Sequence, residues 1–148
     1  MEEALIQRLQ KSFNLLAPRG PELVDRFYAH LFAKHPGLRE LFPDDMSGQK
    51  KKLLASLVLV IQNLRNAERL RPALLDLGRR HAGYKAEPGH YPAVRDTLVQ
   101  VMGEMASEQW NNQLTADWNA ALNLVADIML EGHELEKQPA PSSTKNAS

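Results

Sequence analysis

The 148-residue sequence predicts a single all-α domain, and three observations support this prediction. In nearly every long segment, apolar residues recur at spacings of three and four, the period of a helix with one buried face. Runs of alternating polarity between turn signals, which would predict strands, are hard to find. The length suits one ordinary domain, and a hydrophobic fraction of 43% supplies enough apolar material for one core.

Proline and glycine divide the first third of the chain into helices. We expect a first helix over residues 4–16, ended by the segment APRGP at 17–21, and a second helix after it. A short helix should begin at Pro36, because proline suits a first turn, and end near Phe42, because Pro43 follows. The apolar faces expected for the first two helices are Leu5, Leu9, Phe13 and Leu16, and then Val24, Phe27, Leu31 and Phe32.

Four more helices are expected in the rest of the chain. Ser47 is a favourable N-cap for the first of them, and Pro72 should start the second. Gly83 and Pro88 then separate the second helix from the third. The apolar positions of the last two helices are Tyr91, Val94, Leu98, Val101 and Met105, and then Trp110, Leu114, Trp118, Leu122, Val125 and Met129. The domain should cover residues 1–136, because 137–148 has the Pro- and Ser-rich polar composition of a disordered tail.

Charge and composition exclude several classes of function. Eighteen basic residues balance eighteen acidic ones, so we expect neither a nucleic acid nor a membrane as partner. The absence of cysteine excludes disulfides, thiolate metal sites and cysteine nucleophiles. The N-terminus lacks the pattern of a signal peptide, and the most apolar run, 53–61, is about half as long as a membrane span. We therefore expect a cytoplasmic protein.

His81 lies on the expected buried face of its helix. Leu74, Leu77 and His81 follow the i, i+3, i+7 pattern, so the imidazole shares a face with the two leucines. A core histidine that is merely hydrogen-bonded in place is the commonest explanation of such a position. No second histidine or acidic residue follows at i+4, which argues against zinc. A single axial bond to a haem iron stays possible on these residues alone.

Several segments along the chain together resemble one family. The segments are FYAHLFAKHPGLRELF (27–42), Gln49 with Leu53 four residues later, LRPALLDLGRRHAGY (70–84) and HYPAV (90–94). Their order and spacing are similar to those of bacterial single-domain haemoglobins and of the globin domain of flavohaemoglobins, from about residue 5 to about residue 134. The resemblance implies a globin fold, a three-on-three helical sandwich around haem b (iron protoporphyrin IX), with His81 as the proximal iron ligand.

The resemblance also implies the residues of the distal pocket. Tyr28 and Gln49 match two distal residues that donate hydrogen bonds to bound dioxygen, which carries partial negative charge. Leu53 would limit access to the iron. The remaining residues assigned to the haem are Phe42 against the porphyrin, Leu77 beneath it, and Lys52 and Lys85 at the propionates. Generic core packing explains the apolar three equally well, and a solvated surface explains the lysines.

The proximal side matches the family less completely. In flavohaemoglobins a tyrosine and a glutamate make the ligand histidine a stronger electron donor. Tyr91 matches the tyrosine, whereas either Glu131 or Glu134 could match the glutamate. Leu122 replaces a tyrosine that is common in these proteins, which puts the full network in doubt.

Two functions share this predicted site. The resemblance implies binding of dioxygen, nitric oxide and carbon monoxide, and conversion of nitric oxide to nitrate with Tyr28, Gln49 and Tyr91 in catalytic roles. The chain shows no Gly-rich dinucleotide fingerprint, so this nitric oxide dioxygenation would need a separate flavoprotein reductase. The alternative is a non-enzymatic oxygen carrier, store or sensor. A haem-free helical interaction module is a third possibility, because a fold does not fix a function.

Overall fold

The computed structural model describes residues 1–83 and 87–137, and the described residues form helices and no strand. The α-helices are α1 Glu3–Leu16, α2 Gly20–Lys34, α3 Ser47–Gln62, α4 Ala67–Gly83, α5 His90–Ala106 and α6 Asn112–Lys137. Three short 3₁₀ helices are η1 Ala17–Arg19, η2 Pro36–Leu41 and η3 Ser107–Gln109. The all-α prediction is confirmed. The predicted tail, 137–148, lies outside the described residues except for Lys137.

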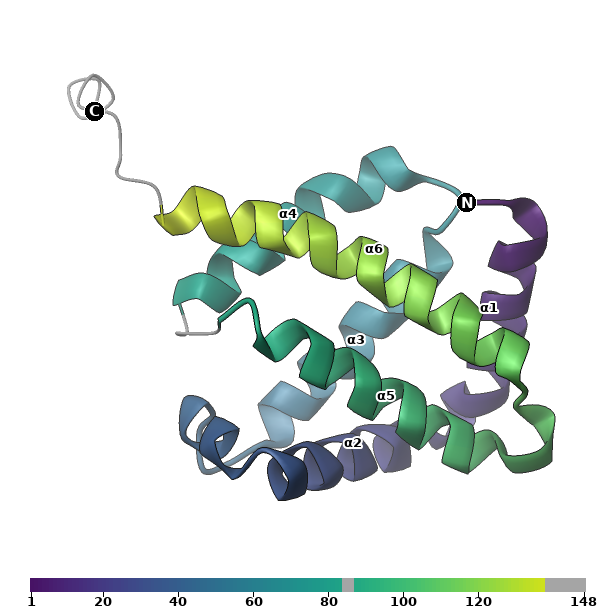
Figure 1. The fold of residues 1–148 in the computed structure, drawn as a ribbon, viewed down its shortest axis with the longest axis horizontal. Helices are drawn as coiled ribbons and strands as arrows, with labels where there is room; N and C mark the ends of the chain where they lie inside the picture. The colour runs from purple at the N-terminus through teal and green to yellow at the C-terminus, as the bar shows by residue number, and fades with distance from the viewer. Residues whose placement is uncertain (84–86, 138–148) are drawn as a thin grey trace.

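The helices pack as crossed and antiparallel pairs. Figure 1 shows α5 and α6 running side by side in opposite directions, joined through η3. α1 packs near the beginning of α6, and α4 packs along its end. α2 lies against α5, and α3 contacts both α2 and α1. None of the described helices is both long and apolar enough to span a membrane.

Three predicted helix boundaries are wrong. Ser47 is the first residue of α3 and not its N-cap, because its N–H and its hydroxyl both donate to the Asp45 carboxylate. Pro72 lies inside α4, which begins five residues earlier, at Ala67. Asn66 is the residue that caps α4, since its side-chain oxygen accepts the N–H of Arg69 at 3.3 Å.

The third wrong boundary concerns Trp110, which precedes α6. Its backbone is extended after η3, and α6 begins only at Asn112. The indole N–H donates to the Thr115 hydroxyl at 2.8 Å, so the tryptophan is held against the first turn of the helix from outside. The apolar spacing that predicts this helix therefore includes a residue that lies before the helix begins.

Polar contacts fasten α1 to α6 within the largest core cluster. Trp118 is fully buried, and its indole N–H donates to the Ser12 hydroxyl at 2.9 Å. Next to it, the buried Asp117 carboxylate accepts two hydrogen bonds from the Arg8 guanidinium, at 2.6 and 3.0 Å. The Arg8 guanidinium accordingly holds the pKa of Asp117 below its ordinary value. Breaking the pair would leave a buried charge without its partner.

The core consists of two clusters. The large cluster draws on α1, α2, α3, α5 and α6, and it includes Tyr28, with Phe42 and Leu53 packed against it. The small cluster centres on Leu70, Leu74 and Met129 from α4 and α6, with Leu77 and Tyr91 packed against it. Val60 of α3 contacts both clusters. The residues predicted for the two sides of a haem thus belong to different clusters.

Backbone contact between α4 and α6 depends on two glycines. A Cβ atom added to Gly78 would lie 1.8 Å from the Met129 carbonyl oxygen, and one added to Gly132 would lie 1.9 Å from the Leu75 carbonyl oxygen. Both obstacles are backbone atoms, so no side chain can move aside to make room. Any side chain at either glycine would force the two helices apart.

We expect Gly78→Ala and Gly132→Ala each to lower the free energy of unfolding by about 2 to 3 kcal/mol, the upper part of the range for overpacked cores. Gly48→Ala is the matched control, because a Cβ at Gly48, also in a helix, meets nothing within 4 Å. Alanine is the better helix former, so this control should be as stable as wild type or more so. Urea unfolding measures all three variants, and equal stability of the three would contradict the backbone contact.

Candidate functional site

A tyrosine and a glutamine from different helices meet at the first part of the site. The Gln49 side-chain amide of α3 donates to the Tyr28 hydroxyl oxygen of α2 at 3.3 Å. Tyr28 is only 5% exposed, and its ring packs against three aromatic rings: Phe27, Phe32 and Phe42. Because the phenol oxygen accepts from Gln49, its own hydrogen stays available for another acceptor.

Burial keeps the Tyr28 hydroxyl protonated. Desolvation raises the pKa of Tyr28 above its ordinary value, and the hydrogen bond from Gln49 opposes this rise more weakly. At neutral pH the side chain is therefore a neutral phenol that can donate. The structure thus brings the side chains of Tyr28 and Gln49, both predicted to be distal, into contact and leaves the phenol able to donate.

His81 lies in the last turn of α4 and is half-buried. Its Nδ1 lies 2.8 Å from the Leu77 carbonyl oxygen, one helical turn earlier. A carbonyl oxygen only accepts, so the ring proton is on Nδ1 and the metal-binding lone pair is on Nε2. Burial lowers the pKa of His81, with smaller contributions from the charges of Arg80 and His133. The neutral imidazole that results is the form that binds a metal.

Apolar side chains suited to cover a haem are present on both sides. Phe42 and Leu53 at the edge of the large cluster, and Leu77 in the small one, are each half-buried. Each therefore keeps apolar surface that a porphyrin could cover. The described residues contain no group of three or more His, Asp or Glu able to hold a metal ion, whereas a haem iron needs only one proximal protein ligand. The residues fit a haem.

The predicted propionate partners are only partly placed. Lys52 is exposed on α3, as a residue at the mouth of a pocket would be, and nothing ties it to a particular ligand. Its neighbour Lys50 forms an ion pair with Asp25 at 3.0 Å. Lys85 lies outside the described residues.

The proximal glutamate predicted for Tyr91 is not found beside it. Glu131 is exposed and pairs with Arg71, and Glu134 is exposed as well. The Tyr91 hydroxyl is buried and has no hydrogen-bond partner among the described residues. Its ring instead meets the imidazole of His133 edge to face, with centroids 6.3 Å apart.

From the sequence we assigned no role to His133, or to His30, His35 and His90. His133 is fully buried, whereas the other three are half-buried or exposed. Helical spacing could have found it, because it lies four residues after Met129 on the face that runs back to Trp118.

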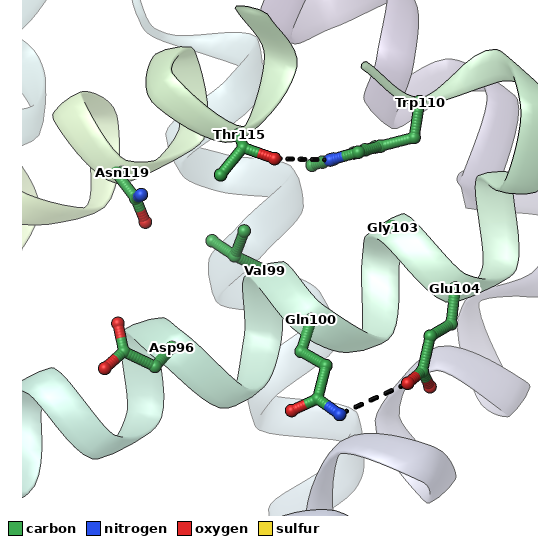
Figure 2. Close-up of a pocket in the computed structure, with 8 residues that line it drawn as sticks. All are labelled: Asp96, Val99, Gln100, Gly103, Glu104, Trp110, Thr115 and Asn119. Carbon is green, nitrogen blue, oxygen red and sulfur yellow. Dashed lines mark hydrogen bonds between the residues drawn. The ribbon is translucent and has the colours of Figure 1, made fainter. Parts of the chain in front are cut away.

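Two surface hollows show where open space lies. Figure 2 shows a hollow between α5 and the beginning of α6 in which polar groups pair with each other, Gln100 with Glu104 and Trp110 with Thr115. It contains none of the predicted site residues. The second hollow lies between η2 and the beginning of α5 and is lined in part by Leu38, Leu41 and Ala93. Figure 1 shows η2, the beginning of α5 and the end of α4 on the same side of the molecule. His81 belongs to the last turn of α4.

Comparison with known families gives a match to the globin model over residues 25–129. The chain belongs to the globin family. A globin-like protein of Aquifex aeolicus is 27% identical over 130 residues, which are 88% of this chain and 92% of that protein. A flavohemoprotein of Pseudomonas aeruginosa is 28% identical over 124 residues, which are 81% of this chain but 32% of that protein. This globin thus spans about a third of the flavohemoproteins that it matches.

The solved structures agree with the fold. A bacterial globin from Campylobacter jejuni superposes on this globin with a TM-score of 0.81 and 19% identity, covering 93% of this chain and 100% of that one. The predicted all-α globin fold is therefore confirmed, and haem is the cofactor that membership of the family implies.

The buried phenol leads to a prediction about pH. Because the folded pKa of Tyr28 is raised above the ordinary value of 10.0, its contribution to stability should be complete below pH 10 and lost as the pH rises through the folded pKa. In a spectrophotometric titration, the absorbance of wild type minus that of Tyr28→Phe should show one phenol that ionises above pH 10. A difference curve centred below pH 10 would contradict the buried, neutral donor.

Proposed function

We propose that this globin binds haem b through His81 and holds dioxygen with hydrogen bonds from Tyr28 and Gln49. The observation that carries the proposal is the contact between the Gln49 amide and the Tyr28 oxygen. It leaves the phenol hydrogen available among aromatic side chains, where a donor that is already oriented needs no reorganisation to meet a negatively charged acceptor. Haem, when bound, supplies the iron at which dioxygen, nitric oxide or carbon monoxide binds.

Each residue contributes one physical property to this function. The Leu77 carbonyl orients the His81 imidazole and fixes its tautomer, as outer partners of metal-binding histidines generally do. Phe42, Leu53 and Leu77 offer apolar surface and exclude water. Tyr28 and Gln49 distinguish dioxygen, which gains negative charge on binding, from carbon monoxide, which gains less.

We further propose that the protein uses dioxygen to convert nitric oxide to nitrate. Nitric oxide, dioxygen and one electron balance one nitrate ion, so each turnover needs one electron. The 148 residues contain no Gly-rich dinucleotide fingerprint, and we assign electron supply to a flavoprotein reductase in the cytoplasm. Similarity to the flavohemoproteins supports this reaction. Non-enzymatic oxygen carriage, storage or sensing is the alternative that uses the same residues.

Haem binding should depend on His81 alone among the exposed and half-buried histidines. We expect His81→Ala to purify largely without haem and to regain it when imidazole is added, because free imidazole can occupy the vacated position. His35→Ala is the control, since His35 is exposed in the loop between α2 and η2. Visible spectra of the ferric and ferrous forms measure haem content and coordination. A normal five-coordinate ferrous spectrum in His81→Ala would refute the ligand assignment.

Oxygen release should report the distal hydrogen bonds. Hydrogen bonds to charged acceptors contribute roughly 1.5 to 3 kcal/mol, so loss of the stronger donor should speed release about tenfold to a hundredfold. Tyr28→Phe should have the larger effect, because the Tyr28 ring is fixed by three aromatic neighbours, whereas Gln49 is half-buried. Stopped-flow spectroscopy measures the rate of dioxygen release. Rates within a factor of two of wild type in both Tyr28→Phe and Gln49→Leu would contradict the assignment of these residues as distal donors.

Sustained nitric oxide consumption separates the enzyme from the carrier. With NADH alone the purified protein should consume nitric oxide only until its ferrous haem is oxidised, and an added flavoprotein reductase should restore steady turnover to nitrate. In cells, wild type should protect against nitric oxide more than Tyr28→Phe at equal haem content. Full haem loading and ready reduction without any protection would refute the enzymatic function and favour oxygen binding or sensing.

A further inference from the structure

The polar side chains buried among the described residues have hydrogen-bond partners, with His133 as the exception. The hydroxyls of Ser12 and Thr97 donate to carbonyl oxygens of their own helices, and the Asp117 carboxylate accepts from Arg8. His133 is 0% exposed, yet neither of its ring nitrogens has a partner in the described part of the chain. An unpartnered polar group in a protein interior costs free energy, so His133 calls for an explanation.

A second unpartnered group lies beside His133. The Tyr91 hydroxyl of α5 is buried and also lacks a partner among the described residues. The Tyr91 ring meets the His133 ring of α6 edge to face, at 80° and with centroids 6.3 Å apart. Unpartnered atoms that arose by accident would be scattered through the interior. Their position on facing side chains of two helices indicates that they share one partner.

The chemistry of the pair limits what this partner is. Burial raises the pKa of Tyr91, so its hydroxyl is a protonated donor at neutral pH. A neutral imidazole has one nitrogen that accepts and one that donates. Glu131 and Glu134, which flank His133 in the sequence, are exposed and give the pair no carboxylate with which to hold a cation. The shared partner must therefore be small and neutral, and must both accept and donate.

We propose that Tyr91 and His133 bind one internal water molecule, which accepts the phenol hydrogen and donates to the unprotonated ring nitrogen. Polar groups too far apart for a direct hydrogen bond are commonly joined in this way. The span suits one water, because two hydrogen bonds of about 2.8 Å are together comparable with the 6.3 Å between the ring centres. The water ties α5 to α6 beside the small cluster, where Tyr91 packs with Leu77. This inference does not depend on the proposed binding of haem.

The number of long-lived internal waters tests the site directly. Oxygen-17 magnetic relaxation dispersion measures this number in the purified full-length protein. We expect Tyr91→Phe to hold one water fewer than wild type, because the phenyl ring keeps the shape of the side chain and loses the hydroxyl. An equal number of waters in Tyr91→Phe and wild type would overturn the inference.

Thr97→Val is the matched control for this measurement. It also removes a buried hydroxyl from α5, but one that donates to the Ala93 carbonyl oxygen at 2.7 Å and needs no water. The control should hold as many long-lived waters as wild type. A loss in Thr97→Val equal to that in Tyr91→Phe would overturn the inference, because the water would then not belong to the pair.

Stability gives a second test, with opposite signs for a pair with and without the water. If the water is bound, Tyr91→Phe should lower the folding equilibrium constant about three- to tenfold, the effect of losing one ordinary hydrogen bond. If no water is bound, the same substitution removes an unpartnered hydroxyl and should leave stability unchanged or raise it. Urea unfolding measures the difference, and a Tyr91→Phe protein at least as stable as wild type would overturn the inference.

A double variant shows whether the two side chains share the water. His133→Leu replaces the imidazole with an apolar side chain of similar size. Adding Tyr91→Phe to His133→Leu should cause no further loss of stability, because the water has already lost one of its two partners. Additive losses would overturn the inference. If His133→Leu does not fold, the water count and the stability of Tyr91→Phe decide without it.

Discussion

The contact of α4 with α6 at Gly78 and Gly132 is the constraint on which the position of His81 depends. It brings two helix backbones together, so small errors in side-chain packing cannot shift one helix along the other. His81 lies three residues after Gly78, and α4 ends two residues further on, at Gly83. The position of the imidazole is therefore set by backbone contact in the middle of α4 and by the Leu77 carbonyl next to it.

Different interactions fix the side chains on the two sides of the site. On the side of Tyr28, aromatic rings and one hydrogen bond between side chains fix the donor. On the side of His81, a bond within one helix and two glycines do so.

Helical spacing predicted the fold class and the face on which His81 lies, because burying one side of a helix forces that pattern on the sequence. The residues at which helices begin were harder to predict. Pro72 looked like a helix start, but Asn66 supplies the cap, and tertiary packing tolerates a proline in the second turn of α4. Ser47 has the side chain of a typical N-cap, but its N–H and its hydroxyl both donate to the Asp45 carboxylate.

The site itself was less predictable from residues alone. Nothing in their separation of 21 residues indicates that Gln49 meets Tyr28, and only resemblance to a family suggested it. The family resemblance points to the acidic neighbours of His133, whereas the angle of each side chain around α6 decides that His133 is the buried one. One position along a helix turns a side chain through about 100°, so Glu131, His133 and Glu134 face different surroundings.

The unequal sizes of the two core clusters bear on how the molecule fluctuates. Segments with few buried apolar contacts open at lower free energy than the rest of a protein, without global unfolding. Among the described residues, the small cluster has three buried members, two of them from α4, whereas the large cluster joins five helices. α4 is therefore the segment expected to exchange its amide hydrogens first, while α1, α2 and α5 stay protected. Release of a haem bound through His81, as proposed, would then follow local opening of α4 and would not need the whole chain to unfold.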